Sequence, residues 1–196
     1  MPGQTCSLSR SQKRFVKSLL KYIVGSKIAL DAGCGSGWLG ASLKECLPLT
    51  VISVDIRKPI AGYRVDSFVV MDIQQIGLTK AFDLIIAKDV VEHVVYPRKA
   101  LQQFHSVLKT NGKIIIDVPS PSAPYLWDDY EHVRPYTKES MTKLLLDSGF
   151  RPIHMRYLAA PTPGATLLRF KGLIDKLADK GLRRGDLIAV AKKQPD

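Results

Sequence analysis

Apolar residues along the chain form two kinds of pattern. Short continuous runs, each closed by a turn residue or an acid, predict five buried strands, namely KIALDAG, TVISVDI, SFVVMDI, FDLIIAKDV and GKIIIDVPS. Segments with an apolar residue every three or four positions predict helices over 12–24, 37–47 and 97–109. Strands that are apolar throughout are buried on both faces, so their alternation with helices predicts a parallel sheet between two helical layers. We therefore expect a doubly wound, Rossmann-like α/β fold.

The last third of the chain departs from this alternation. Residues 119–137, PSPSAPYLWDDYEHVRPYT, follow the fifth strand and are rich in proline and aromatic residues, which predicts an irregular loop. A helix is expected over 137–150, and the runs RPIHMRYL and DLIAVAKK predict two more strands. Ligands of open α/β sheets bind at the carboxyl ends of the strands, so the loop 119–137 is expected to border a binding site.

The size and composition of the chain fit one globular domain. Its 196 residues are 45% hydrophobic and 24% charged, which are ordinary values for a folded domain. We expect a basic N-terminal helix within 1–27, a cofactor-binding core over 28–118 and a substrate side over 119–196. No apolar run is long enough to span a bilayer and no secretory signal is evident, which predicts a cytoplasmic protein. The three cysteines lack C-x-x-C spacing and are expected to be free thiols.

The formal net charge of +11 comes from the two ends of the chain. Residues 1–27 carry six Lys or Arg residues and no acid, and residues 151–196 carry ten against four acids. Such flanks suit a nucleic acid, an anionic membrane surface or an acidic partner, and equally simple solvation. Within the second flank, the segment 164–184 is basic and amphipathic. Four interpretations of it stay open: a lid on the site, a membrane contact, a dimer contact or a helix packed on the core.

A glycine-rich loop, LDAGCGSGWLG, follows the first predicted strand. Two spacings overlap in it: Gly33-x-Gly35-x-Gly37, and Gly35-x-Gly37-x-x-Gly40, of which the second alone is typical of dinucleotide binding. Glycines at such a turn let backbone N–H groups and the positive end of the next helix approach a ligand. Many ligands are bound in this way, so the glycines alone leave the cofactor undecided.

Acids at the ends of successive strands narrow the choice of ligand. Asp55 closes the second strand, where a carboxylate can accept both hydrogen bonds of a ribose diol. Asp72 closes the third strand, where it can accept from an exocyclic amine such as that of adenine. Asp31, just before the glycines, would repel a pyrophosphate and attract an ammonium group. Together the three acids favour a ligand with a ribose, an adenine and a cation, which describes S-adenosylmethionine.

With these acids in place, the motifs resemble those of class I S-adenosylmethionine-dependent methyltransferases. ALDAGCGSGWLG is similar to the first motif of that family, VISVDI to the second and VVMDIQQI to the third. The stretch from FDLIIAKDV to GKIIIDVPS resembles the small-molecule branch that includes quinone-biosynthesis methyltransferases. The resemblance covers about residues 28–150 and implies a seven-stranded sheet whose last strand is antiparallel.

The resemblance also implies a cofactor site, residue by residue. No metal is required, because the sulfonium methyl group is already electrophilic and needs chiefly an aligned acceptor. The residues expected around S-adenosylmethionine are Asp31, Gly33, Cys34, Gly35 and Gly37 at its methionine part, Asp55 and Ile56 at its ribose and adenine, Asp72 and Ile73 at its adenine, and Lys88 through its backbone.

A hydroxyl or protonated amine acceptor is helped by a general base, and histidine is the obvious side chain for that role. Of the four histidines, His132 lies among charged residues in the loop 119–137 and is predicted to be the catalytic base. A scaffold role for His132 through local hydrogen bonds is the alternative. His93 follows the fourth strand and is expected to make a structural hydrogen bond, while His105 and His154 are expected to be packing residues.

The sequence thus predicts an enzyme, an S-adenosylmethionine-dependent methyltransferase acting on a small molecule of a lipid or quinone-like kind. Methylation of a nucleic acid or a protein is a second interpretation, which the basic flanks favour, although no N-P-P-Y or D-P-P-Y motif of base-modifying enzymes is present. A cofactor-binding partner protein without catalysis is a third. The acceptor and the oligomeric state are left open.

Overall fold

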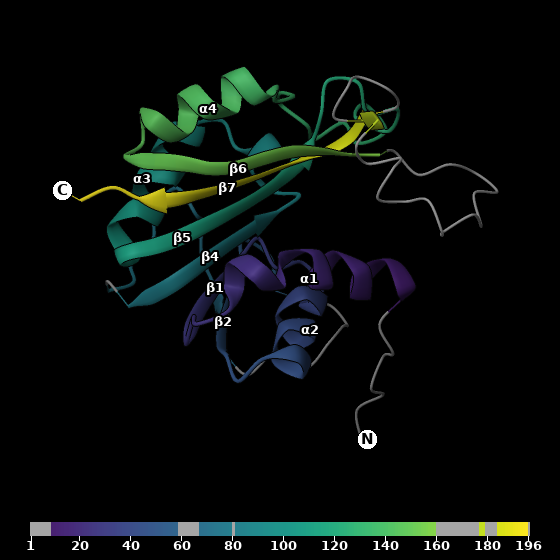
Figure 1. Ribbon diagram of the computed structural model, residues 1–196. Helices are drawn as coiled ribbons and strands as arrows, with labels where there is room; N and C mark the ends of the chain where they lie inside the picture. The colour runs from purple at the N-terminus through teal and green to yellow at the C-terminus, as the bar shows by residue number, and fades with distance from the viewer. Residues whose placement is uncertain (1–8, 59–66, 80, 160–176, 179–183, 196) are drawn as a thin grey trace.

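One seven-stranded sheet organises the computed structural model, which describes residues 9–58, 67–79, 81–159, 177–178 and 184–195. The order of the strands is β3-β2-β1-β4-β5-β7-β6 (Figure 1). β1 to β5 pair in parallel, and β7 is antiparallel to both of its neighbours. The predicted Rossmann-like sheet with an antiparallel last strand is confirmed. The strands are β1 (Ile28–Ala32), β2 (Thr50–Asp55), β3 (Ser67–Val70), β4 (Phe82–Lys88), β5 (Leu108–Pro119), β6 (Phe150–Ala159) and β7 (Arg184–Lys193).

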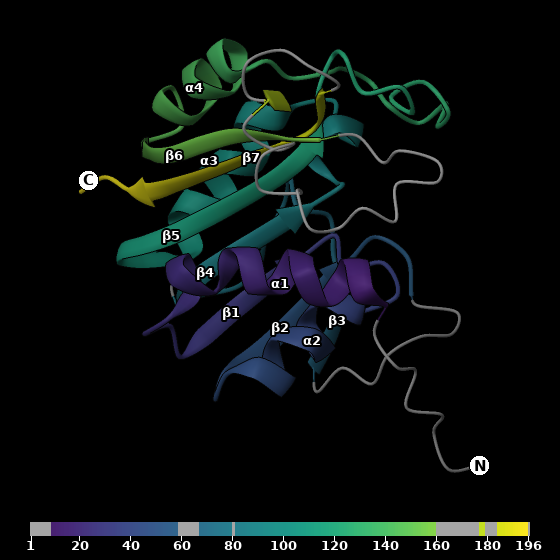
Figure 2. The ribbon, with the colours of Figure 1, turned by 45° about the vertical axis from the view of Figure 1, so that its right-hand side comes forward.

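Helices cover both faces of this sheet, as the apolar stripes predicted. α1 and α2 lie on one face, where Leu19 and Leu43 share a core cluster with Leu84 and Ile86 of β4. α3 and α4 lie on the opposite face and join the larger core cluster (Figure 2). The helices are α1 (Arg10–Ile23), α2 (Trp38–Cys46), α3 (Pro97–Val107) and α4 (Lys138–Leu146), with a short 3-10 helix η1 (Val91–His93) after β4.

The helices end within a few residues of the predicted positions; α4, expected over 137–150, ends at Leu146 because Phe150 already begins β6. Two other differences also have local reasons. α1 begins two residues early, because Ser9 and Gln12 form a reciprocal capping box in which each side chain accepts from the other's backbone N–H. α3 ends at Val107 instead of residue 109, because Leu108 already pairs with Phe82 in the ladder between β4 and β5. Both shifts leave the order of elements as predicted.

The sheet brings the carboxyl ends of its parallel strands to one edge. β1 is flanked by β2 and β4, so the loops after these three strands meet there. The loop that follows β5 also begins at this edge. Within the described part of the chain, no helix combines the length and the apolar character needed to cross a membrane. Most of the basic segment 164–184 lies outside the described residues, so its role stays a prediction.

Candidate functional site

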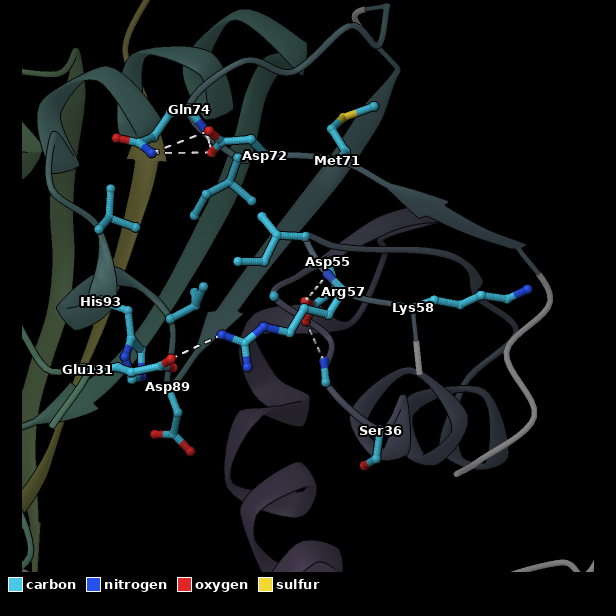
Figure 3. A pocket seen from close by; sticks show the side chains of 16 residues that line it. Ser36, Asp55, Arg57, Lys58, Met71, Asp72, Gln74, Asp89, His93 and Glu131 are labelled. Carbon is cyan, nitrogen blue, oxygen red and sulfur yellow. Dashed lines mark hydrogen bonds and ion pairs between the residues drawn. The ribbon is translucent and has the colours of Figure 1, made fainter. Parts of the chain in front are cut away.

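Two adjoining hollows lie along the carboxyl edge of the parallel strands. The larger has a volume of about 560 Å³ and reaches from the residues after β2 and β3 to η1 and the loop 119–137. The smaller, of about 210 Å³, lies between the end of β1, the end of β4 and the start of α2. Both are lined by Gly33, Gly35, Ser36 and Asp89, and we call the pair the edge groove. Figure 3 shows the side chains that line the larger hollow.

Most of the predicted cofactor residues line the edge groove. Gly37 lines neither hollow; it is the N-cap of α2 and has a φ of +80°. The structure thus brings nine of the ten residues together, and their roles toward a cofactor stay predictions. The larger hollow is lined by Gly33, Gly35, Asp55, Ile56, Asp72 and Ile73, and the smaller by Asp31, Gly33, Cys34, Gly35 and Lys88.

The glycine loop turns back against β2, with left-handed backbone angles at its first three glycines. The Gly33 and Cys34 amides donate to the Val54 carbonyl of β2, at 2.9 and 3.0 Å, which holds the loop against the neighbouring strand. Gly33 has a φ of +71°, and a Cβ at this position would lie 2.4 Å from Cγ2 of Val90. A side chain is therefore excluded here both by the backbone angle and by the close approach of the residues after β4.

The thiol of the cysteine in this loop is held in its protonated form. Burial, with the nearby acids Asp31 and Asp55, raises the pKa of the Cys34 thiol to about 12, so the thiol stays protonated at neutral pH. Cys34 and Cys46 are free thiols, as predicted, and Cys6 lies outside the described residues.

The carboxylate of Asp31 joins β1 to α2. It is buried, with 2% of its surface exposed, and accepts a hydrogen bond of 3.1 Å from the Gly40 amide in the first turn of the helix. A Cβ on Gly40 would lie 3.1 Å from a methyl group of Val51 and 3.3 Å from the Asp31 carboxylate. Gly40 therefore serves close packing of helix on sheet, and it lines neither hollow. Burial raises the pKa of Asp31 to about 7, despite the Gly40 hydrogen bond.

Asp55 and Asp72 stand at the ends of β2 and β3 and face the larger hollow. The Asp55 carboxylate accepts from the amides of Gly35 at 2.9 Å and Arg57 at 3.0 Å. The Asp72 carboxylate accepts from the backbone N–H of Gln74 at 2.8 Å. A carboxylate has about four acceptor positions, so both groups keep capacity for further donors. Backbone amides of the surrounding loops thus hold both acids in place.

Lys88 ends β4 and is held between two carboxylates. Its Nζ lies 2.7 Å from an oxygen of Asp89 and 2.8 Å from one of Asp117, which is fully buried. Burial disfavours the charged ammonium, but the two carboxylates outweigh it and raise the pKa of Lys88. Burial raises the pKa of Asp117, and the Lys88 ammonium opposes that shift. The side chain of Lys88 is thus already occupied by ion pairs within the protein.

Several residues of the groove were not predicted from the sequence. Asp89 lines both hollows with a φ of 51°, a left-handed conformation that is uncommon outside glycine and often marks functional sites. Arg57 pairs with Glu131 at 3.0 Å, and both line the larger hollow, so this ion pair links the residues after β2 to the loop 119–137 (Figure 3). A positive φ and a contact across 74 residues leave no signature in local sequence. Ser36, Lys58, Met71, Gln74, Val90, His93 and Val94 complete the wall of the larger hollow.

The predicted base His132 lies close to the groove without lining it. Its Nδ1 contacts the Leu126 carbonyl, and its ring lies against that of His93, with 4.6 Å between ring centroids. His93, which was expected to be structural, lines the larger hollow. The role of His132 as a base stays a prediction. His105 and His154 pack against the rings of Phe150 and Tyr22, away from the groove.

This strand order, with a glycine loop after β1 and acids at the ends of the first three strands, defines the open α/β fold of methyltransferase domains. A family model described as a methyltransferase domain matches residues 7–155. The chain belongs to this family. The family resemblance that its motifs predicted is thereby confirmed.

Relatives of known name match part of the chain. Over 116 residues it is 30% identical to malonyl-[acyl-carrier protein] O-methyltransferase of Halalkalibacterium halodurans, covering 52% of this chain and 43% of that protein. It is 33% identical over 116 residues to ubiquinone biosynthesis O-methyltransferase of Bradyrhizobium diazoefficiens, covering 55% of this chain and 45% of that protein. The matches therefore span less than half the length of these relatives.

Solved structures show the same fold. A structure of an S-adenosylmethionine-dependent methyltransferase from Archaeoglobus fulgidus superposes with a TM-score of 0.68. The two sequences are 22% identical, and the superposition covers 93% of this chain and 94% of that one. At this identity the likeness supports the architecture alone.

The pairing of Lys88 with Asp117 predicts how variants of this pair will unfold. Lys88→Met leaves the Asp117 carboxylate buried without its cation and should lower the free energy of unfolding by about 3–5 kcal/mol. Because the pKa of the uncompensated Asp117 is raised, this loss is greatest at pH 8 and shrinks as the pH falls and the carboxyl is protonated. Urea unfolding at pH 8 and pH 5.5 measures both effects.

The double variant Lys88→Met/Asp117→Leu is the matched control for that experiment. It removes both charges and should recover most of the lost stability. A single variant Lys88→Met that unfolds within about 0.5 kcal/mol of the unaltered protein would contradict a structural role for this side chain.

Proposed function

We propose that the chain is an S-adenosylmethionine-dependent methyltransferase whose acceptor is an oxygen atom of a small molecule. The edge groove would hold the donor, with adenosine in the larger hollow and the methionine part in the smaller one. The observation that carries this proposal is the placement of Asp31, Asp55 and Asp72 along one groove beside a glycine loop. Three carboxylates suit a ribose, an amine and a cation, and oppose a pyrophosphate.

The division of the cofactor between the hollows follows from their linings. The larger hollow combines the acceptors Asp55 and Asp72 with the apolar side chains of Ile56 and Ile73, which suits a ribose and a flat apolar ring. The smaller hollow contains Asp31, whose buried carboxylate can face the ammonium group of the methionine part. The two hollows share the residues of the glycine loop, where the sulfonium would lie between them.

An oxygen acceptor is supported by the relatives of known name, both of which are O-methyltransferases. The larger hollow has an apolar end, where Val90 and Val94 lie beside His93. A hydroxyl on a lipid or quinone-like ring agrees best with this lining. The positively charged flanks would favour an anionic surface or an acidic carrier that presents such an acceptor.

Transfer of an isotopically labelled methyl group tests the function directly. Purified protein incubated with cell extract and S-adenosylmethionine carrying a ¹³C-methyl group should place the label on a small molecule, identified by mass spectrometry. The variant Asp55→Ala should weaken donor binding by about 1–3 kcal/mol through lost hydrogen bonds and lose labelling at low donor concentration. Asp128→Ala, an exposed acid of the loop outside the groove, is the matched control and should label normally. Label found only on protein or nucleic acid would contradict the acceptor class.

The raised pKa of Asp31 predicts a pH dependence of donor binding. The ammonium of the donor favours the ionised carboxylate, so the pKa of Asp31 falls in the complex, and binding below pH 7 must displace a proton. Affinity for S-adenosylhomocysteine should therefore weaken as the pH falls from 7.5 to 5.5, by up to about tenfold per unit at the acid end. Titration calorimetry at several pH values measures this slope.

Two controls isolate Asp31 in that experiment. 5′-Methylthioadenosine keeps the adenosine and the thioether but lacks the amino group, so its affinity should vary much less with pH. Asp31→Asn should bind S-adenosylhomocysteine more weakly and without the slope. Equal slopes for the two ligands would show that Asp31 does not face the ammonium group.

A further inference from the structure

Three titratable side chains gather where the larger hollow meets the loop 119–137. Glu92 and His93 belong to η1, and His132 belongs to the loop. The amides of Val133 and Arg134 donate to the Glu92 carbonyl, at 2.9 and 3.4 Å, which joins the loop to η1. Ligand-capable atoms of the three side chains lie within 4.8 Å of one another. We call these three residues the histidine cluster.

Glu92 is the innermost member of the histidine cluster. It is fully buried, and among the described residues neither of its carboxylate oxygens has a hydrogen-bond partner. An unpartnered buried carboxyl group is costly for the fold, and native structures contain few of them. Burial raises the pKa of Glu92 to about 8, with the charges of Asp89 and Asp117 acting in the same direction.

His132 is oriented toward Glu92 and not toward the groove. Because a carbonyl oxygen can only accept, Nδ1 is the donor in its contact with the Leu126 carbonyl. Nε2 lies 4.0 Å from Oε1 of Glu92, and only 9% of the side chain is exposed. One ring nitrogen is thus held by a backbone carbonyl, and the other faces the Glu92 carboxyl group beyond hydrogen-bond distance.

His93 is the member of the histidine cluster that reaches the larger hollow. Its Nδ1 is buried and has no hydrogen-bond partner among the described residues. Four side chains lie close to its ring: Glu92 and His132 of the histidine cluster, and Asp129 and Glu131 of the loop, whose carboxylate atoms lie within 4.8 Å of it. Asp89, which also lines the hollow, adds a further negative charge at this end.

We propose that His93 accepts the proton of the methyl acceptor and that Glu92 and His132 position it for this step. The inference rests on the proposed function, because it needs an oxygen acceptor in the larger hollow. The acceptor class is a hydroxyl on an aromatic or quinone-like ring. His93 is then the catalytic residue that touches the substrate, and the role predicted for His132 becomes that of a positioning residue.

The proton and the electrons balance within this arrangement. As the acceptor oxygen forms a bond to the methyl carbon, the bond between that carbon and sulfur breaks and its electron pair stays on sulfur, which becomes a neutral thioether. The O–H electron pair stays on oxygen, and its proton passes to a nitrogen of His93. The positive charge of the sulfonium is thus replaced by that of an imidazolium on His93, beside the Glu92 side chain. The proton later leaves to solvent through the open groove.

Carbethoxylation by diethyl pyrocarbonate tests the placement of His93 without an acceptor. The reagent modifies unprotonated, accessible imidazoles, and mass spectrometry of peptides reports each of the four histidines separately. We expect modification of His93 that saturating S-adenosylhomocysteine slows at least fivefold, with His132 much less reactive. His105 and His154 are internal controls, since they lie outside the groove and should not respond to the ligand. Modification of His132 that the ligand blocks, with His93 inert, would overturn the assignment.

Two catechol probes of different acidity test the proton transfer. Methyl transfer to catechol should fall about 10²–10⁴-fold in kcat in His93→Gln, since the hydroxyl loses its base. Transfer to 4-nitrocatechol should fall less than tenfold, because this far more acidic hydroxyl is already largely ionised at pH 8. Glu92→Gln and His132→Gln should show the same difference between probes to a smaller extent, with KM little changed. His154→Gln is the matched control and should keep full activity.

Each other outcome of these measurements has a fixed meaning. Equal losses with both probes in His93→Gln would mean a structural role and would overturn the proposal. Loss of activity in EDTA that an added divalent metal restores would also overturn it, because it would assign the three side chains to a cation. If S-adenosylhomocysteine fails to bind at all, the proposed function fails. If it binds but neither catechol is methylated by the unaltered protein, the proposed acceptor class fails, and the carbethoxylation result alone decides the placement of His93.

Discussion

The hydrogen bond between the buried Asp31 carboxylate and the Gly40 amide is the interaction on which the groove depends. It ties the end of β1 to the first turn of α2 and thereby fixes both ends of the glycine loop. A side chain at position 40 would press on the strand, since its Cβ would lie 3.1–3.3 Å from side chains of β1 and β2. With the loop held from both ends, its amides reach the Val54 carbonyl and the Asp55 carboxylate. A single buried acid thus holds the loop that forms the floor of the site and is one of the acids that line it.

The charges of the molecule are arranged by depth. Acids line the groove and the interior behind it, where burial raises the pKa values of Asp31 and Glu92 toward neutrality. Three cations also line the groove: Lys88 and Arg57, each already paired with a carboxylate, and Lys58. The net positive charge of the sequence comes from the two flanks. A cationic cofactor is therefore favoured inside the groove, while a larger anionic partner would meet the protein from outside.

Sequence patterns predicted the elements of this fold well because each pattern reports a local constraint. Apolar runs marked all seven strands. The glycine loop was placed correctly because left-handed backbone angles favour glycine, so such a turn can be detected from residue type. The pairing of Arg57 with Glu131 was not predictable in this way, since it joins residues 74 apart. The histidines were ranked by sequence neighbourhood, which put His132 first. The ring of His93 reaches the groove because η1 turns it there, and a three-residue helix has no periodicity to detect.

The choice of cofactor is the central claim, and it is tested most directly by titration calorimetry of the unaltered protein with S-adenosylhomocysteine and with NADH at pH 7.5. The second glycine spacing in the loop is typical of dinucleotide binding, whereas the acids of the edge groove oppose a pyrophosphate. We predict that one molecule of S-adenosylhomocysteine binds per chain and that NADH produces no heat of binding. Binding of NADH without a response to S-adenosylhomocysteine would contradict the claim.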